Sequence, residues 1–237
     1  MTIDPLIRKL EQFAPLSSEA RAALEAMPSR LHEYGKAEAI VEQGTSPDES
    51  ALVVTGCVFR YKRTSDGGRQ IVALHIPGDF VDLHSYVLKP MDHSVAAIVP
   101  SIIARVPHAK ITEILAHHPH LTRNLMWDMA LDAAIGREWM VAMGRRRAPK
   151  QIAHLFCEMY FRMRRVGLVK EGSFEFALTQ QDIGDLCGLS TVHVNRSIQG
   201  LRAKSLIAMD KSAVTILALD ELIALAGFDA AYLHLLE

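Results

Sequence analysis

Cysteine is scarce in this chain of 237 residues, and Cys57, Cys157 and Cys187 lie far apart without forming a Cys-x-x-Cys pair. An odd, scattered set argues against a disulfide framework and favours a reducing cytoplasm. No apolar run approaches the roughly 18–20 residues of a membrane-spanning helix. The N-terminus also lacks the basic-then-apolar pattern of a signal peptide. We therefore expect a cytoplasmic protein without a membrane span.

Aromatic residues are also few, at 6%, whereas hydrophobic residues reach 49% and charged residues 22%. This balance is typical of an ordinary globular protein whose core is built from Ala, Leu, Ile and Val. The sequence contains no Gly-rich phosphate loop, nucleophile elbow or His-Glu-x-x-His motif. We expect no enzymatic activity.

The net charge of −1 carries little information, but its distribution is uneven. Residues 144–209 hold 11 Lys and Arg against 5 Asp and Glu, and residues 1–143 hold 14 against 17. A basic C-terminal region behind an acidic N-terminal one favours phosphate binding. A solvated charged face is the alternative explanation.

The first half of the chain changes from helical to strand-like patterning. Residues 5–30 show apolar residues at helical spacing, with Ser17 or Ser18 as a cap for a second short helix. Residues 31–107 alternate short apolar runs with Gly, Pro and Asp, and Asp66-Gly67-Gly68 marks a tight hairpin. The candidate strands are residues 39–41, 50–54, 57–61, 70–76 and 95–99.

Helical patterning returns after Pro107, and Pro119 begins a long helical segment that runs to about residue 143. Along it, apolar and small residues recur in steps of three and four, which favours pairing with the same helix of a second chain. Packing on the core of its own domain is the alternative. The seam comprises Met126, Met129, Ala133, Gly136, Met140 and Met143.

Residues 144–149 interrupt this helix and suggest a hinge, because Pro149 cannot continue regular helix hydrogen bonding. We expect a further helix over residues 151–165 and a short strand over residues 174–177. Two more helices follow. Residues 206–209 and 213–216 then form a two-stranded wing around a turn at residues 210–212.

The two helices before the wing have the pattern of a helix-turn-helix. Thr179 and Ser190 can cap them, and Gly188 supplies the sharp turn between them. The second helix is expected to present polar side chains to the major groove of DNA, with Arg196 suited to guanine and Asn195 to adenine. An ordinary helical hairpin with a solvated face is the alternative. The candidate DNA-binding residues are Thr179, Gln180, Gln181, Ser190, Thr191, His193, Asn195, Arg196 and Gln199.

The motif over residues 178–206 closely resembles the winged helix of the Crp–Fnr transcription regulators, and the resemblance covers almost the entire chain. It implies an α+β fold with a jelly-roll or β-roll sensor domain of cyclic-nucleotide-binding type over residues 1–118. A dimerisation helix over residues 119–144 and a winged helix-turn-helix domain over residues 145–237 would follow. The implied partners are a second copy of the chain, a pseudo-palindromic double-stranded DNA operator and RNA polymerase.

This chain departs from the family pattern on the helix expected to read DNA. By the resemblance, Arg196 falls on the family's arginine that contacts bases or phosphates. Val192 stands where many members have a base-reading glutamate, and Asn195 where many have serine or glycine. Losing the carboxylate removes an acceptor for cytosine N4. The resemblance therefore implies DNA binding but a different target sequence, to which His193 can contribute.

The sensor half departs too. Val81 and Asp82 replace the Gly-Glu pair that holds the ribose in cyclic-nucleotide binders, and His93-Ser94 stands in place of the Arg-Ser pair for the cyclic phosphate. A histidine lacks the fixed charge and the fork of an arginine, so we do not expect cyclic AMP as the ligand. The candidate effector pocket comprises Val81, Asp82, Leu83, His84, His93 and Ser94.

Other cofactors find little support in the sequence. An iron–sulfur cluster is not expected, because no cysteine precedes Cys57, which as a lone strand cysteine is expected to be inert. His84 with His93 could ligate a metal or haem, and the histidines of residues 117–120 could ligate a metal. No cysteine or carboxylate cluster completes either site, so we expect no metal. The alternatives are a ligand- or metal-sensing module whose helix-turn-helix binds protein, or an enzyme using the histidine-rich β-roll.

Overall fold

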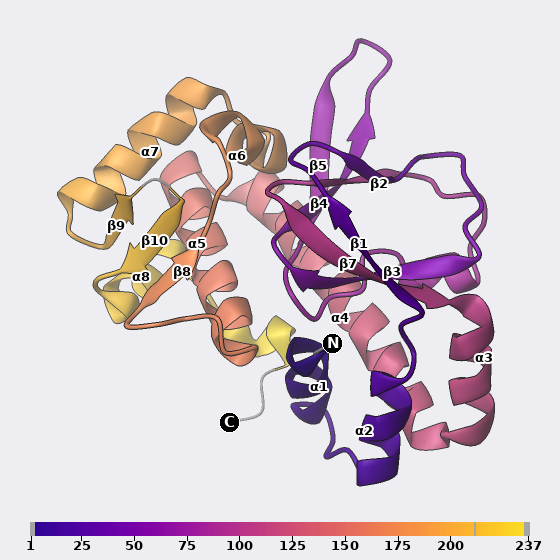
Figure 1. Ribbon diagram of the computed structural model, residues 1–237. Coiled ribbons are helices and arrows are strands. Elements are labelled where there is room, and N and C mark those ends of the chain that lie inside the picture. The colour runs from indigo at the N-terminus through magenta and orange to yellow at the C-terminus, as the bar shows by residue number, and fades with distance from the viewer. Residues whose placement is uncertain (1–2, 211, 235–237) are drawn as a thin grey trace. The chain divides into compact units, whose positions relative to one another are not determined.

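A computed structural model describes residues 3–210 and 212–234 of the chain (Figure 1). Its internal contacts divide these residues into two compact units. The first unit contains residues 3–63 and 72–132, and the second contains residues 64–71 and 133–234. Over the described residues, no helix is long and apolar enough to cross a membrane. The chain is of mixed α and β structure, as expected.

The first unit is built on two antiparallel sheets. One has the order β1-β7-β3, formed by Arg30–Tyr34, Ser101–Pro107 and Glu49–Thr55. The other has the order β2-β6-β4-β5, formed by Ala39–Val41, Ser94–Ala97, Val58–Arg63 and Arg69–His75. All five expected strands are present, although β6 ends two residues earlier than expected.

Strands β1 and β7 are not among the strands predicted from the sequence. β7 is the central strand of its sheet and pairs with both β1 and β3. Its residues 103–106 are all buried, so it lacks the alternation of apolar and polar residues that marks a half-exposed strand. The two core clusters cover the two faces of β7, and only the tertiary structure shows this.

An apolar core joins the two sheets. Because side chains alternate across a strand, β3 contributes Ala51 and Val53 and β6 contributes Val95 and Ala97, each pair two residues apart. The core is formed by Tyr34, Ile40, Val41, Ala51, Val53, Val58, Val81, Met91, Val95, Ala97 and Ile103. It confirms that strands of this part of the chain pack as two sheets around a common core.

A second apolar cluster packs helices against the outer face of β3 and β7. Leu52, Ala104 and Val106 supply the strand side of this cluster. The helical side comes from α1 (Asp4–Glu11), α2 (Ser18–Glu25), η1 (Leu83–Tyr86), α3 (His108–His117) and the start of α4. The Ser17 hydroxyl caps α2 by accepting a hydrogen bond from Ala20 N at 3.1 Å, as expected.

The loop after β5 lies directly against α1. Gly78 has a φ of 92°, and a Cβ there would lie 2.6 Å from the backbone of Pro5, so only glycine permits this approach. Next to it, buried Lys9 contacts the carboxylates of Asp79 and Asp128, each at 2.5 Å. Burial disfavours the Lys9 charge, but the two carboxylates outweigh it and raise the Lys9 pKa. This charge cluster joins α1, the loop and α4.

Replacing Lys9 with Ala would leave two buried carboxylates without their cation. Breaking a buried pair in this way costs about 3–5 kcal/mol. We expect a large fall in the urea midpoint of the full chain, followed by tryptophan fluorescence, to which Trp127, stacked on Phe13 in this unit, contributes together with Trp139 of the second unit. Lys110→Ala is the control, because its ion pair with Glu113 is exposed and is worth at most about 1 kcal/mol. Equal midpoints for the two variants would contradict the assignment.

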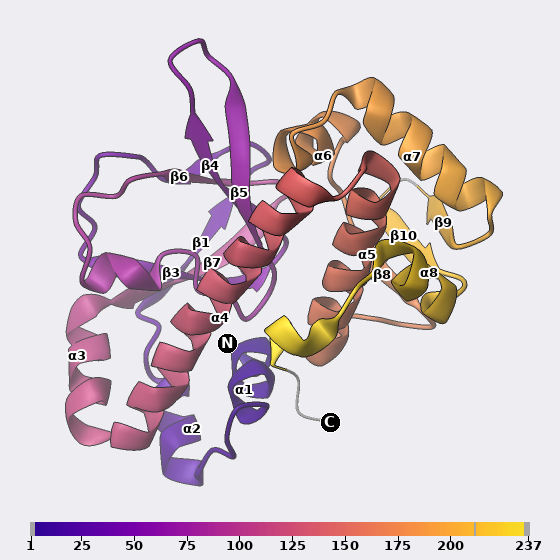
Figure 2. The same ribbon diagram turned by 180° about the vertical axis from the view of Figure 1, so that it is seen from behind.

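α4 is a single helix over Pro119–Arg145, and the boundary between the two units falls within it (Figure 2). Its expected seam is open to solvent in the single chain. Met126 and Met140 are 65% and 62% exposed, Met129, Ala133 and Met143 are also exposed, and Gly136 is half-buried. A Cβ built on Gly136 meets nothing within 4 Å. The seam therefore does not pack on the core of its own domain, which the sequence left as the alternative.

The second unit surrounds α5 (Ala148–Arg165) with helices and one small sheet. The sheet has the order β8-β10-β9, formed by Ser173–Glu175, Ala213–Ile216 and Ile207–Asp210. The helices are α6 (Gln180–Cys187), α7 (Thr191–Ala203), α8 (Leu219–Ala226) and η2 (Ala230–Leu233). Strands β9 and β10 are the expected wing. Lys211, which the sequence predicts to lie in the turn of the wing, is outside the described residues.

The fully buried carboxylate of Glu158 holds several elements of the second unit together. Glu158 on α5 accepts hydrogen bonds from Trp139 Nε1 at 3.0 and 3.1 Å, from Arg162 at 3.1 Å and from the Tyr232 hydroxyl at 2.8 Å. A buried charge is tolerated only when it is paired and hydrogen-bonded in this way. Glu158 therefore connects α4, α5 and η2 within the second unit.

Candidate functional site

The two helices of the expected helix-turn-helix are α6 and α7, and both are capped as expected. Thr179 forms a capping box with Asp182, in which Asp182 N donates to the Thr179 hydroxyl at 3.1 Å and Thr179 N donates to the carboxylate at 3.0 Å. Ser190 caps α7 by accepting from His193 N at 3.4 Å. Gly188 ends α6 with a φ of 67°, the left-handed conformation that the sharp turn requires.

A second glycine sets how closely the turn approaches α6. A Cβ on Gly184 would lie 2.6 Å from the carbonyl oxygen of Leu189, a backbone atom that cannot rotate away. The amide of Leu189 donates to the Gly184 carbonyl at 3.0 Å. Gly184 therefore allows the backbone contact that fixes α7 against α6, and the sequence analysis did not assign it this role.

Replacing Gly184 with Ala would force its new Cβ against the Leu189 carbonyl. Overpacking of this kind costs about 1–3 kcal/mol, and we expect a lower urea midpoint for the full chain, followed by circular dichroism. Gly200→Ala is the matched control, since Gly200 lies on α7 with nothing within 4 Å of its Cβ position. There, Ala should stabilise by about 0.5–1 kcal/mol. The two variants must shift the midpoint in opposite directions.

The two helices separate apolar from polar side chains. Ile183, Leu186, Val194, Ile198 and Leu201 are buried. The side chains that we expected to contact DNA are all exposed: Thr179, Gln180, Gln181, Ser190, Thr191, His193, Asn195, Arg196 and Gln199.

Local contacts order part of this exposed surface. Asn195 Nδ2 donates to Gln180 Oε1 across the two helices at 3.3 Å, and Ser190 and His193 contact each other at 3.0 Å. No hydrogen bond or ion pair involving Arg196 occurs among the described residues. Arg196 is therefore an exposed cation that is available to an external anion.

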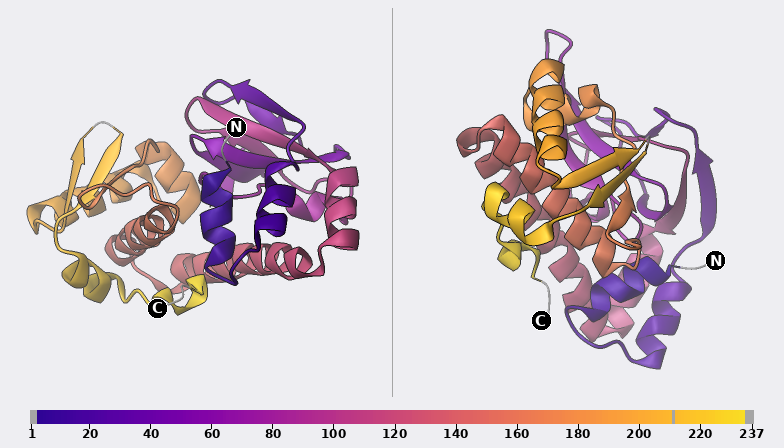
Figure 3. Two further views of the ribbon diagram at one scale, coloured as in Figure 1. Left: turned by 60° about the horizontal axis from the view of Figure 1, so that its bottom comes forward. Right: turned by 90° about the vertical axis from the view of Figure 1, so that its left-hand side faces the viewer.

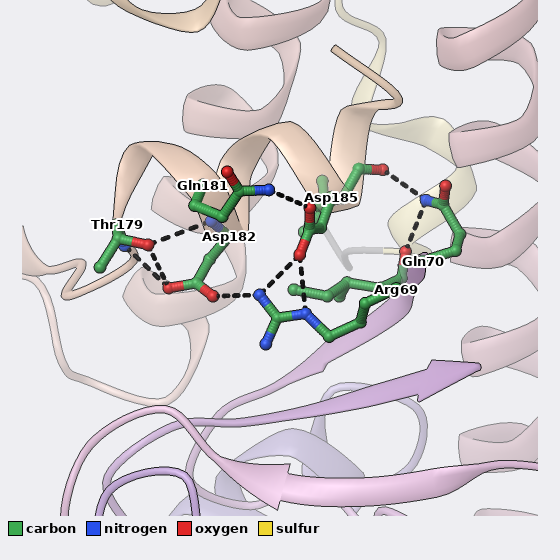
Figure 4. Close-up of polar contacts among 8 residues, drawn as sticks. Arg69, Gln70, Thr179, Gln181, Asp182 and Asp185 are labelled. Atoms are coloured by element: carbon green, nitrogen blue, oxygen red, sulfur yellow. Dashed lines mark hydrogen bonds and ion pairs between the residues drawn. The ribbon is translucent and has the colours of Figure 1, made fainter. Parts of the chain in front are cut away.

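Two carboxylates of α6 are bound by an arginine from the β-hairpin segment that belongs to the second unit (Figure 4). Arg69 donates from Nη2 to Asp182 at 2.6 Å and from Nε to Asp185 at 2.7 Å. Neighbouring Gln70 donates to the carbonyl of Leu186 at 3.2 Å. Although burial opposes its ionisation, the bonds from Thr179 and Arg69 keep the pKa of Asp182 below its usual value. Arg69 thereby neutralises negative charge on a helix expected to approach phosphates, a role that the sequence analysis missed.

The strands β9 and β10 pair from Ile207↔Ile216 to Asp210↔Ala213, and β8 adds a third strand on the other side of β10. Figure 3 shows this sheet and the orange helix α7 from two further directions. Phe174 of β8 and Phe176 after it pack near Phe156 and Tyr160 of α5. The aromatic contacts anchor the wing to the core of the second unit.

The expected effector-pocket residues lie in different environments. Val81 belongs to the core between the sheets and Leu83 to the helical cluster. Ser94 begins β6, and its hydroxyl accepts a hydrogen bond from Gln43 N at 3.1 Å. His84 and His93 are the pair that lies side by side, with ring centroids 5.1 Å apart.

Three charged residues near this pair were not predicted. Arg60 of β4 donates to Asp132 of α4 at 2.9 Å and to the carbonyl of Val81 at 2.6 Å. Asp92 contacts Nδ1 of His93 at 2.7 Å. Arg60 and Asp132 are 72 residues apart, so no local sequence pattern indicates their proximity. The guanidinium of Arg60 is therefore already engaged by a carboxylate and a carbonyl.

Asp82 is a buried carboxyl group at the start of η1. Burial raises its pKa to about 7, against the opposing effects of a hydrogen bond from Ala51 N at 2.6 Å and the charges of Arg105 and Arg60. Its second oxygen, Oδ2, is buried without a hydrogen-bond partner. The Asp82 side chain thus connects the start of η1 to β3 through its hydrogen bond from Ala51 N.

Asp82→Asn tests this pKa. Because the folded state keeps a proton that the unfolded chain releases above pH 4, wild-type stability from this group is complete below pH 4 and is lost as the pH rises through about 7. Asn cannot ionise, so the urea midpoint of the variant, relative to that of the wild type, should rise between pH 5 and pH 8.

Asp66→Asn is the control for this measurement. Asp66 is exposed, and a hydrogen bond from Thr64 holds its pKa below the usual value, so it does not titrate between pH 5 and pH 8. A difference between Asp82→Asn and wild type that stays constant over this range would refute the raised pKa.

Comparison with known proteins agrees with the helix-turn-helix that α6 and α7 form. Residues 31–118 match the cyclic nucleotide-binding domain model, and residues 150–225 match the Crp-like helix-turn-helix domain model. The chain is 28% identical over 229 residues to the transcriptional activator protein FnrL of Cereibacter sphaeroides, covering 94% of this chain and 91% of FnrL. It is 26% identical over 212 residues to the transcriptional activator protein Anr of Pseudomonas protegens, covering 90% and 86%.

Among solved structures, FixK2 from Bradyrhizobium japonicum is similar with a TM-score of 0.75 and 25% identity, over 85% of this chain and 98% of FixK2. Fold, helix-turn-helix geometry and relatives together define a transcription regulator with a cyclic-nucleotide-binding-type domain and a DNA-binding winged helix. The two matched domains are those of the Crp–Fnr regulators, and the relatives and structural neighbours of this chain are regulators of that family.

Proposed function

We propose that this regulator acts as a homodimer that binds a pseudo-palindromic operator, with α7 of each chain in successive major grooves about 34 Å apart. The observation that carries the proposal is the set of exposed polar side chains on the capped helices, among them Arg196, which has no ion pair or hydrogen bond within the described part of the chain. The N-terminus of α6, with Thr179, Gln180 and Gln181, suits contacts to the phosphate backbone. RNA polymerase is a further partner in this proposal.

The exposed seam of α4 supports the dimer. Large exposed apolar side chains in a row on one helix are covered in most proteins, and an antiparallel or parallel copy of the same helix offers a complementary surface. Gly136 in the middle of the seam permits close approach of two backbones. A two-fold dimer uses the same surface on both chains, so a second copy of this chain would cover the seam.

The operator sequence is proposed to differ from that of relatives with a glutamate on α7. Val192 is 62% exposed at the start of this helix and offers no hydrogen bond to a base edge. Asn195 and His193 are the exposed polar groups beside it. They are the side chains that would compensate for the missing carboxylate.

The sensor domain is proposed to respond to a ligand other than cyclic AMP. A cyclic phosphate needs a fixed positive charge. Burial lowers the pKa of His93, so this imidazole is neutral at pH 7, and Arg60 is already paired with Asp132. The same proposal includes no catalytic activity, no iron–sulfur cluster and a cytoplasmic location.

Arg196→Ala tests the DNA interface. Loss of a base-contacting arginine should weaken specific binding by about 1–3 kcal/mol, roughly 5- to 150-fold, and relax selectivity at one position of each half-site. Binding would be measured by fluorescence anisotropy on a duplex selected from random sequence, at several salt concentrations.

Arg164→Ala is the matched control, because Arg164 is an exposed arginine at the end of α5, outside the helix-turn-helix. It should change affinity less than twofold. Unchanged affinity and salt dependence for Arg196→Ala would instead support a helix-turn-helix that binds protein.

A further inference from the structure

Two histidines and a carboxylate of the first unit converge beside β6. His84 lies on η1, and Asp92 and His93 lie immediately before Ser94, the first residue of β6. Each of the three residues offers one ligand atom, and these atoms all lie within 4.8 Å of one another. We propose that His84, Asp92 and His93 form a binding site for a divalent transition-metal ion of the Zn²⁺ type.

His93 and Asp92 are already placed as neighbouring ligands. The His93 side chain is 4% exposed, and its Nδ1 atom contacts the Asp92 carboxylate at 2.7 Å. An ion bound here would replace this hydrogen bond and be shared by Nδ1 and the carboxylate. Nε2 lies on the opposite side of the ring and cannot bind the same ion.

The chemistry of the three residues suits a metal of intermediate softness. Two imidazole nitrogens and one carboxylate oxygen are a usual set of protein ligands for Zn²⁺, with water in the fourth position. His84 is half-buried and Asp92 is exposed, so an ion can reach the site from solvent.

The protonation of these groups also favours a cation. Burial, followed by the nearby charge of Arg60, lowers the pKa of His84 to about 4 and also lowers that of His93. The hydrogen bond with His93 lowers the pKa of Asp92. At pH 7 both imidazoles are therefore neutral and the carboxylate is charged, which are the forms that bind metal.

The remaining charges around the site are largely balanced. Arg60, whose charge acts on both histidines, is paired with Asp132 at 2.9 Å. Lys62 lies 3.4 Å from Asp92 as one half of an exposed pair, which contributes little energy and can be displaced.

This inference goes beyond the proposed function and revises the expectation of no metal site. Sequence reasoning considered His84 and His93 and found no carboxylate to complete them. The structure supplies Asp92, which is adjacent to one histidine in sequence and close to the other only because η1 packs beside the start of β6. Metal binding can be measured without DNA, so failure of this proposal leaves the DNA-binding proposal intact, and the reverse also holds.

The test is calorimetric titration of the untagged, full-length, chelator-treated protein with ZnCl₂. Co²⁺ absorption serves as a second readout, because its visible bands report the coordination geometry. We expect one ion per chain. His84→Ala and Asp92→Asn should each weaken binding at least tenfold, because the first removes a ligand and the second replaces a charged ligand with a neutral one. Both residues are at least partly exposed, so these variants should keep their fold, which circular dichroism verifies.

His117→Ala is the control for adventitious binding by surface histidines. His117 is part of the histidine run at residues 117–120, on α3 and the start of α4, and its Nδ1 contacts the carbonyl of Glu113 at 2.9 Å. It should leave the stoichiometry and affinity unchanged. Absence of Zn²⁺ binding to the wild type, or binding that persists in His84→Ala and is lost in His117→Ala, would overturn the proposal.

Discussion

The arrangement of the DNA-binding helices depends on the carboxylate of Asp182. One of its oxygens closes the capping box with Thr179, and the other accepts a charge-assisted hydrogen bond from Arg69. A single side chain therefore begins α6 at a defined residue and attaches the hairpin segment Thr64–Ile71 to the same helix. Because charge-assisted bonds are short and directional, this contact orients α6 as well as stabilising it. The orientation of α6 in turn sets the directions in which its exposed side chains point.

Backbone contacts then transfer the geometry of α6 to α7. Gly184 lets the Leu189 carbonyl approach within a distance that any Cβ would prevent, and Gly188 reverses the chain in a left-handed conformation. With both turns fixed, the buried stripe of α7 packs inward and Arg196 is left outside. A protein that reads DNA needs this rigidity, because base contacts are sensitive to small displacements of the helix.

In the first unit, by contrast with the exposed polar side chains of α6 and α7, several polar and charged groups are buried inside the fold. Lys9 is neutralised by two buried carboxylates, Asp82 has a pKa near 7, and His93 has an unused buried nitrogen. Such groups cost stability, and they are the places where a bound ligand can change the energy of the fold most. Asp82 and His93 lie at the start of η1 and just before β6, whereas Lys9 lies on α1 with its partners in the loop after β5 and on α4.

Local sequence determined the caps, the hairpin turn, the wing and the exposed face of α7, because Thr179, Ser190 and Gly188 act through residues three or four positions away. It also determined the apolar seam of α4, since helical periodicity is a local property. The tertiary structure alone decided that β7 lies at the centre of its sheet, that Arg69 binds α6, and that Asp92 completes a cluster with His84. Those contacts join residues whose spacing follows no helical or strand period, so only the packing of the folded chain brings them together.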